Sequence, residues 1–252
     1  MRLENQVAVV TGGAMGLGRV YSVRLAQEGA DVCVWDVQIE GAEETAAMVR
    51  KLGRKSLAVR ADVTSEEDTI GAARKTFDTF GKIDILINNA GIVRDVLKVP
   101  LEEVALEDWN RVVGVNLTGV FLASKAVVPY LKRNGKGKIV NMSSNVALHG
   151  TALRHDYAAS KAGVIGLTRA LASELGQFNI NVNAITPAAV IIPEMRAQLT
   201  GEIPEAMIAG RYIRRPIFAE DLEGVVAFLA SSESDLMTGQ VVNVDGGRVF
   251  VG

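Results

Sequence analysis

The sequence predicts an α/β fold, a single doubly wound parallel sheet with helices on both faces. Seven short runs rich in β-branched apolar residues recur along the chain, and their continuous hydrophobicity is typical of strands buried on both faces. Between them lie longer segments with apolar residues three and four positions apart, which is typical of amphipathic helices. Strands that alternate with helices in this way form parallel sheets, because each helix carries the chain back to start the next strand.

The strands are predicted where the apolar runs lie, and the helices where the three- and four-residue spacing follows. The predicted strands, in order, are residues 7–11, 31–36, 55–60, 83–88, 138–142, 179–185 and 241–244. The predicted helices are residues 17–28, 41–52, 66–80, 106–132, 157–177 and 221–231. No linker rich in proline or serine interrupts the alternation, so we expect one domain over residues 1–252.

Composition and charge exclude several classes of protein. The 252 residues are 48% hydrophobic and 22% charged, and a net charge of −2 lacks the basic excess of a nucleic-acid binder. No signal-peptide pattern and no uninterrupted apolar stretch near ~20 residues is evident, so we expect no membrane segment and a cytoplasmic location. The lone Cys33 is expected as a buried strand residue, and His149 and His155 lack the ligand pattern of a metal site.

A glycine-rich turn joins the first predicted strand to the first predicted helix. Residues 11–18 read TGGAMGLG, and glycines at 12, 16 and 18 allow a tight turn and close approach of the backbone to a pyrophosphate. The free N–H groups at the helix start then bind the phosphate oxygens. This arrangement is typical of a Rossmann-type fold that binds a dinucleotide. The predicted cofactor contacts in this turn are Gly12, Met15, Gly16, Leu17 and Gly18.

The residues after the next two strands indicate which dinucleotide binds. Asp36 ends the second predicted strand, 18 residues beyond Gly18, where a carboxylate accepts both adenosine-ribose hydroxyls and repels a 2′-phosphate. Arg19 is the nearest cation in sequence, and on the helix it points to phosphate or solvent. We therefore expect NAD rather than NADP, although an aspartate after a strand also serves as an ordinary turn residue. Asp62 and Val63, after the third strand, are predicted to contact the adenine.

Ser144, Tyr157 and Lys161 form a candidate catalytic group. Tyr157 and Lys161 are four residues apart in a predicted helix, so their side chains share one face. A lysine cation nearby lowers the pKa of a phenol from its usual value of about 10, which makes the tyrosine a better base. Tyr157 then takes the proton of an alcohol as hydride leaves the carbon, and Ser144 holds the substrate oxygen.

These motifs, in their order along the chain, resemble the classical short-chain dehydrogenase/reductase family over nearly the whole sequence. The matching serine lies thirteen residues before the tyrosine, as Ser144 does and Ser143 does not. The residues that carry the resemblance are Thr11, Gly12, Gly16, Gly18, Asn88–Gly91, Asn116, Ser144, Tyr157, Lys161, Asn183–Pro187, Gly239 and Asp245–Gly247.

The resemblance implies further roles. Asn116 is similar to a helix asparagine that holds a water linking the lysine to solvent, although it also suits a residue that satisfies nearby backbone. Lys161, with Tyr157, would also bind the nicotinamide ribose. The family often forms homotetramers through long helices, here near 106–132 and 157–177. The further cofactor contacts implied are Asn89, Ala90, Gly91, Pro187 and Val190.

Residues 188–218 are expected to bind substrate, and they depart from the family pattern. Ala188 stands where the family usually has glycine after Pro187, and Ile192 replaces a threonine whose hydroxyl would bind the cofactor. Other expected pocket parts are residues 93–94 and 145–156. Several cations lie in these segments, so one hypothesis is an apolar or ring-bearing substrate with an acidic group; the alternative is a solvated loop surface. These cations are His149, Arg154, His155, Arg211, Arg214 and Arg215.

Three functions remain open on the sequence. The first is an NAD-dependent alcohol dehydrogenase or ketone reductase acting on a small-molecule secondary alcohol or ketone. The second is a 3-oxoacyl reductase acting on acyl-carrier-protein or coenzyme A esters, against which Asp36 counts because such biosynthetic enzymes usually use NADPH. The third is a non-catalytic NAD-binding scaffold, against which the intact Ser144, Tyr157 and Lys161 count.

Overall fold

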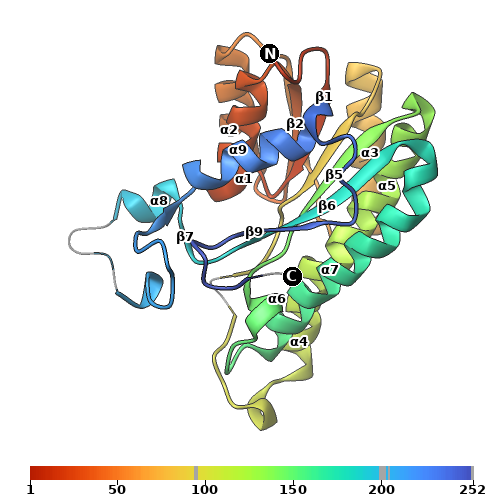
Figure 1. Cartoon of the computed structure of the whole chain (residues 1–252). Helices are drawn as coiled ribbons and strands as arrows, with labels where there is room; N and C mark the ends of the chain where they lie inside the picture. The colour runs from red at the N-terminus through yellow and green to blue at the C-terminus, as the bar shows by residue number, and fades with distance from the viewer. Residues whose placement is uncertain (94–95, 199–202, 204, 251–252) are drawn as a thin grey trace.

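A parallel seven-stranded sheet forms the centre of the computed structural model, which describes residues 1–93, 96–198, 203 and 205–250 (Figure 1). Its strand order is β3-β2-β1-β4-β5-β6-β9. The direction of winding reverses between β1 and β4, so the predicted doubly wound fold is confirmed. The strands are β1 (Val7–Thr11), β2 (Asp31–Asp36), β3 (Ser56–Arg60), β4 (Ile85–Asn88), β5 (Gly137–Met142), β6 (Ile180–Pro187) and β9 (Val241–Val244).

Helices cover both faces of the sheet and bury its two apolar surfaces (Figure 1). One face packs against α1 (Gly16–Gln27), α2 (Ile39–Lys51) and α9 (Glu220–Ala230). The other packs against α3 (Glu66–Phe80), α5 (Gly119–Asn134) and α7 (His155–Leu175). Neighbouring strand residues serve opposite faces, since Val10 belongs to the first core and Val9 to the second. Cys33 lies in the second core, as predicted, and burial raises the pKa of its thiol to about 11.

The segment predicted as one helix over residues 106–132 contains a change of helical pitch. It consists of α4 (Leu106–Val113), a π-helical turn (Gly114–Thr118) and α5. Apolar periodicity did not reveal this turn, because one extra residue per turn barely alters the pattern over so short a stretch. The turn holds Asn116, and π-helical turns inside α-helices are frequent at functional sites.

The same segment also differs from the expectation that no stretch could span a bilayer. Residues Leu106–Asn134 are long and apolar enough to cross a membrane by length and composition, and an 18-residue stretch within them has a mean hydropathy of 1.6. One face of α5 nevertheless packs in the core, where Ala123, Val127 and Leu131 are buried against the sheet. The packing of a core helix accounts for the apolar composition of that face.

Several short elements of the described chain were not predicted. They are β7 (Val190–Ile191), β8 (Ile217–Phe218), α6 (Val146–His149), α8 (Pro193–Arg196) and four 3₁₀ turns (Leu101–Glu103, Gly176–Phe178, Glu205–Met207 and Ser232–Ser234). The strands β7 and β8 pair in parallel as a separate small sheet. Part of the predicted substrate segment, 199–202 and 204, lies outside the described residues, as does Arg94.

Candidate active site

The glycine-rich turn lies at the carboxyl end of β1, against the loop that follows β4. Gly12 has a φ of +64°, and a Cβ there would lie 2.7 Å from the Cα of Ala90. A Cβ on Gly18 would lie 2.1 Å from the carbonyl oxygen of Gly12. Only glycine fits at these two positions, so the turn has the close backbone packing that the sequence predicted for a dinucleotide site.

A carboxylate already binds the start of α1. Met15, half exposed, is the residue before the helix, and its side chain caps no backbone N–H. The backbone N–H of Gly16 donates to Oε1 of Glu194, in α8, over 3.0 Å. The N–H of Gly16 therefore binds an anionic oxygen, which is the chemistry a pyrophosphate requires. Leu17, the next residue, packs against the first core.

Glu194 is a residue that sequence reasoning missed. Its second oxygen, Oε2, is buried and has no hydrogen-bond partner among the described residues. Ile192 closes over the same turn, since its Cδ1 would lie 3.3 Å from a Cβ on Gly16. Ile192, which replaces the family's threonine, and Glu194 thus cover the glycine turn with an apolar side chain and a carboxylate. No local signal indicates a contact across 178 positions in sequence.

Asp36 ends β2 with its carboxylate fixed by backbone donors. Oδ2 accepts from the N–H of Ala14 and Oδ1 from the N–H of Gln38, each over 2.9 Å. Each carboxylate oxygen has two acceptor positions, so both retain one for a ribose hydroxyl. Arg19 does not pair with Asp36, because its guanidinium binds Glu44, Thr45 and nearby backbone carbonyls.

Asp62 and Val63 follow β3 as expected, and both make contacts within the protein. Asp62 Oδ1 accepts from the N–H and the hydroxyl of Thr64, over 2.8 and 2.7 Å. Val63 is buried, with its Cγ2 2.7 Å from where a Cβ on Gly119 would lie. The adenine contact at these residues stays a prediction.

Asn89 connects the ends of β1 and β4. Its side-chain amide donates to the carbonyl oxygens of Thr11 and Gly12, over 3.1 and 3.0 Å. The hydroxyl of Thr11 accepts in return from the backbone N–H groups of Asn89 and Ala90. Gly91 follows, and a Cβ there would lie 3.5 Å from Nζ of Lys161. These bonds hold the glycine turn beside the candidate catalytic residues.

Ser144, Tyr157 and Lys161 lie together, buried, at the carboxyl edge of β5. Ser144 follows β5, and its side chain hydrogen-bonds that of Tyr157. Nζ of Lys161 lies 5.9 Å from the centre of the Tyr157 ring and donates to the carbonyl oxygen of Met142 over 2.8 Å. The three side chains are between 4 and 6% exposed. The helical spacing thus brings the predicted catalytic residues together.

The pKa of Tyr157 differs from the value that the sequence led us to expect. Burial raises the pKa of Tyr157, and the hydrogen bond with Ser144 and the positive charge of Arg154 offset part of the increase. Burial also lowers the pKa of Lys161 to about 8, because a desolvated ammonium is less stable than a neutral amine. The pKa of the phenol is therefore raised overall, and the cation that opposes this rise is Arg154.

Known proteins of similar sequence and structure identify the family of this chain. A family model described as enoyl-(acyl carrier protein) reductase matches residues 12–248. The 3-oxoacyl-[acyl-carrier-protein] reductase FabG of Thermotoga maritima is 40% identical, covering 99% of this chain and 100% of the relative. The chain belongs to the short-chain dehydrogenase/reductase family. It is therefore an oxidoreductase by family.

Two further members of this family extend the comparison. The cis-4-hydroxycyclohexanecarboxylate dehydrogenase of Sinomonas cyclohexanicum is 38% identical, covering 98% of this chain and 97% of the relative. A crystal structure of NAD⁺-bound xylitol dehydrogenase superposes with a TM-score of 0.91 at 32% identity, covering 98% of this chain and 100% of that chain. The bound NAD⁺ of that neighbour supports a nicotinamide cofactor for the family fold seen here.

Asn116, which the family resemblance placed in a proton relay, is fully buried in the π-helical turn. Its Oδ1 accepts from the N–H of Ile92 over 2.7 Å, and its Nδ2 donates to the carbonyl oxygen of Ile92 over 3.1 Å. Nδ2 also lies 3.3 Å from the hydroxyl of Ser160. The side chain satisfies nearby backbone, which was the alternative drawn from the sequence, and the relay role stays a prediction.

The remaining predicted contacts lie at the end of β6 and in β7. The carbonyl oxygen of Pro187 accepts from the N–H of Asn145 over 3.0 Å, which ties β6 to the loop after Ser144. Val190 begins β7 and packs against the first core. Both lie near the carboxyl edge, where the short-chain dehydrogenase/reductase pattern places the cofactor's nicotinamide end.

The six candidate substrate cations have different surroundings. Arg211 is buried and donates to the carbonyl oxygens of Arg215 and Ala189, and Arg215 forms a two-bond ion pair with Asp221. His149 and Arg214 are exposed. Arg154 is the candidate that contacts the catalytic group among the described residues, with its Cζ 4.9 Å from the centre of the Tyr157 ring.

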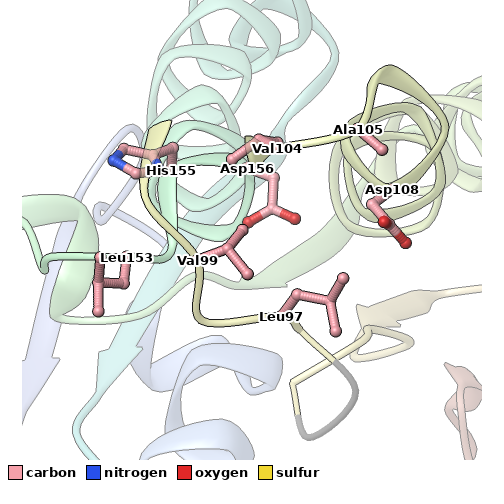
Figure 2. Close-up of a pocket in the computed structure, with 8 residues that line it drawn as sticks. All are labelled: Leu97, Val99, Val104, Ala105, Asp108, Leu153, His155 and Asp156. Carbon is pink, nitrogen blue, oxygen red and sulfur yellow. The ribbon is translucent and has the colours of Figure 1, made fainter. Parts of the chain in front are cut away.

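A small cavity lies beside α7, below its first turn. Its lining residues, labelled in Figure 2, include His155 and Asp156 of α7, Asp108 of α4, and Leu97 and Val99 from the loop before α4. Nδ1 of His155 is buried without a hydrogen-bond partner in the described part of the chain. The carboxylate of Asp156 accepts from the N–H of Tyr157 over 2.7 Å, so it fixes the first turn of the helix that carries the catalytic tyrosine.

Proposed function

We propose that this chain is an NAD-dependent dehydrogenase that transfers hydride between nicotinamide and a secondary alcohol or ketone, with Tyr157 as the acid/base. The observation that carries the proposal is the buried group of Ser144, Tyr157 and Lys161 beside a glycine turn that only glycine fits. Burial excludes water from the proton transfer, and a dinucleotide held by the turn would lie next to the tyrosine.

NAD, when bound, supplies the hydride acceptor for oxidation of the alcohol. Ser144 holds the substrate oxygen through its hydroxyl, and Tyr157 takes the alcohol proton at its phenolic oxygen. Arg154, with its Cζ 4.9 Å from the ring centre, stabilises the phenolate, and Lys161, with its Nζ 5.9 Å from that centre, adds to this effect when it is protonated. Reduction of a ketone uses the same residues with the proton moving in the opposite direction.

Asp36 supports NAD as the preferred cofactor. Its carboxylate is held by two backbone N–H groups and forms no ion pair with any described cation. A 2′-phosphate placed there would meet an uncompensated negative charge. The residues that would hold the cofactor are Gly12, Met15, Gly16, Leu17, Gly18, Asp36, Asp62, Val63, Asn89, Ala90, Gly91, Tyr157, Lys161, Pro187 and Val190.

Titration of the purified protein with NADH and with NADPH, followed by nicotinamide fluorescence, tests this assignment. We expect NADH to bind at least about tenfold more tightly, which corresponds to about 1.4 kcal/mol. Replacing Asp36 by serine should reduce that preference. NADPH preference in the wild type would contradict the role of Asp36.

A second candidate, reduction of 3-oxoacyl thioesters, is favoured by the FabG relative at 40% identity. The two candidates are separated by comparing acetoacetyl-coenzyme A and NADPH with cyclic ketones and NADH. A higher kcat/KM for the thioester with NADPH would favour the reductase.

We also propose a single-domain homotetramer in the cytoplasm, with small-molecule substrates and no nucleic-acid partner or resident metal. Leu106 in α4 and Phe121 in α5 are large apolar side chains that are 72 and 44% exposed. Their burial between subunits would remove apolar surface from water. Light scattering of the purified protein gives the subunit number directly.

A further inference from the structure

Arg154 stands at the point where the loop after β4 approaches the first turn of α7. It directly precedes α7, and its carbonyl oxygen accepts from the N–H of Ala158, so the backbone is fixed by the helix. Its side chain reaches across to the carbonyl oxygen of Val93, to which Nη2 donates. The guanidinium therefore spans from the catalytic helix to the loop beside the site, passing the ring of Tyr157.

The hydrogen bonds of Arg154 leave much of its donor capacity unused. A guanidinium has five N–H donors. No described carboxylate lies within ion-pair distance of it, in contrast to Arg215 beside Asp221. Nε is buried without a partner among the described residues. Nη1 has no hydrogen-bond partner among the described residues, and Arg154 as a whole is partly exposed.

The backbone before Arg154 is held in an uncommon conformation. Leu153 has a φ of +62°, a region that a branched side chain rarely adopts. Such strain persists where the surrounding structure imposes it, and it is frequent beside functional sites. Here the effect is to turn the chain so that the following residue, Arg154, points back over Tyr157 instead of outward.

Apolar side chains also pack around the ring of Tyr157. Val96 and Val112 are buried with it in a small cluster, and Ile92 and Val146 pack against that cluster. A substrate oxygen at Tyr157 would thus lie beside aliphatic side chains and the guanidinium of Arg154, which forms no ion pair with a described carboxylate. Apolar surface suits a carbon ring, and a guanidinium suits a carboxylate, with which it forms paired charge-assisted hydrogen bonds.

We propose that Arg154 determines substrate specificity by binding the carboxylate of an oxo or hydroxy acid with an apolar, ring-bearing body. This inference rests on the proposed dehydrogenase function and adds the substrate class to it. Arg154 has a direct role in binding substrate, distinct from its electrostatic effect on Tyr157. The two roles predict different kinetics, because only the first depends on the charge of the substrate.

The test compares a panel of oxocyclohexanecarboxylates with their methyl esters, using NADH and the wild type, Arg154→Gln, Arg154→Lys and Arg214→Gln. We expect Arg154→Gln to lower kcat/KM about 10- to 100-fold for the acids and less than about threefold for the esters. Arg154→Lys keeps the charge and should retain part of the preference for acids. Arg214→Gln compares a second candidate cation, which is exposed, and its loss should leave the ratio unchanged if Arg154 is the residue that binds the carboxylate.

Each outcome separates the inference from the function on which it rests. Equal losses for acids and esters would overturn substrate binding and make Arg154 a positioning residue that acts through Tyr157. Wild-type kcat/KM for both acids and esters in Arg154→Gln would also overturn the inference, and would leave the proposed dehydrogenase function in place. Failure of the wild type to reduce any acid or ester, with NADH bound, would reject the proposed ketone substrates themselves. NADH affinity near that of the wild type shows that each variant is folded.

Discussion

Replacing Glu194 by glutamine tests whether its carboxylate competes with the cofactor for the start of α1. Oε1 of Glu194 accepts from the N–H of Gly16 over 3.0 Å, at the position where we place the pyrophosphate. Cofactor binding therefore has to break this hydrogen bond and move a negative charge. Glutamine preserves the shape of the side chain and removes the charge, so it isolates the electrostatic part of the competition.

The expected change in the Kd for NADH depends on the charge repulsion between Glu194 and the pyrophosphate and on how exposed Glu194 is. Two unit charges about 5 Å apart interact by roughly 3 kcal/mol at an effective dielectric constant of about 20. Glu194 lies on the short helix α8 and is partly exposed, so its carboxylate can move towards solvent and part of this repulsion is screened. We expect about 1–2 kcal/mol to remain, which lowers the Kd for NADH about 5- to 30-fold in Glu194→Gln.

Fluorescence titration with NADH measures this Kd, and Glu220→Gln is the matched control. Glu220 is also acidic and nearby in the fold, but it pairs with Arg196 on the surface, where both side chains are 60% exposed. The control should change the Kd less than about twofold. An unchanged or weaker NADH affinity in Glu194→Gln would refute the competition and indicate that Glu194 leaves the turn without cost.

Three more substitutions test the catalytic group and the core. Tyr157→Phe should bind NADH normally and lose about 10²- to 10⁴-fold in kcat, because it lacks the acid/base; a near-normal rate would reject the assignment. The pKa of Lys161 is about 8 in the folded protein and about 10.4 in an unfolded chain, so the wild type gains stability as the pH rises through this window. Lys161→Met should abolish turnover. In urea titrations it should also raise the free energy of unfolding, by about 2 kcal/mol at pH 7 and by less at pH 10, because methionine removes the buried charge. An equal increase at both pH values would contradict this explanation. Tyr21→Phe should stabilise the protein by about 1–2 kcal/mol in the same assay, since the hydroxyl of Tyr21 is buried with no partner among the described residues; a loss of stability would show that the hydroxyl is bonded.

The sheet was predictable from the sequence because each strand is a continuous apolar run. The bounds of β1, β2 and β9 agree with the prediction, and the other four strands differ by one or two residues at an end. The helices that cover the sheet follow equally well. The short β7, β8 and α8 carry too few residues for a periodic pattern, and only their packing beyond the carboxyl edge defines them.

The candidate site was predictable where a motif places its residues on one element. Tyr157 and Lys161 share a face of α7, and Ser144 follows β5 at the same edge. The contacts that the sequence did not indicate join distant segments, as Glu194 does with Gly16. The direction of the pKa shift of Tyr157 was also missed, because the desolvation of a side chain depends on every element packed around it.

Glu194 and Arg154 act at different ends of the site, and their effects are separable by experiment. Glu194 contacts the glycine turn and influences how tightly the cofactor binds, whereas Arg154 contacts Tyr157 and the loop at Val93. Among the described residues they share no bonding partner, so their free-energy effects should add within about 0.5 kcal/mol. The ratio of kcat/KM for an acid to that for its ester is measured on the same enzyme with the same cofactor, so any change in NADH affinity cancels from it. A change in that ratio on replacing Glu194 would therefore mean that the segment over the glycine turn also shapes the substrate pocket.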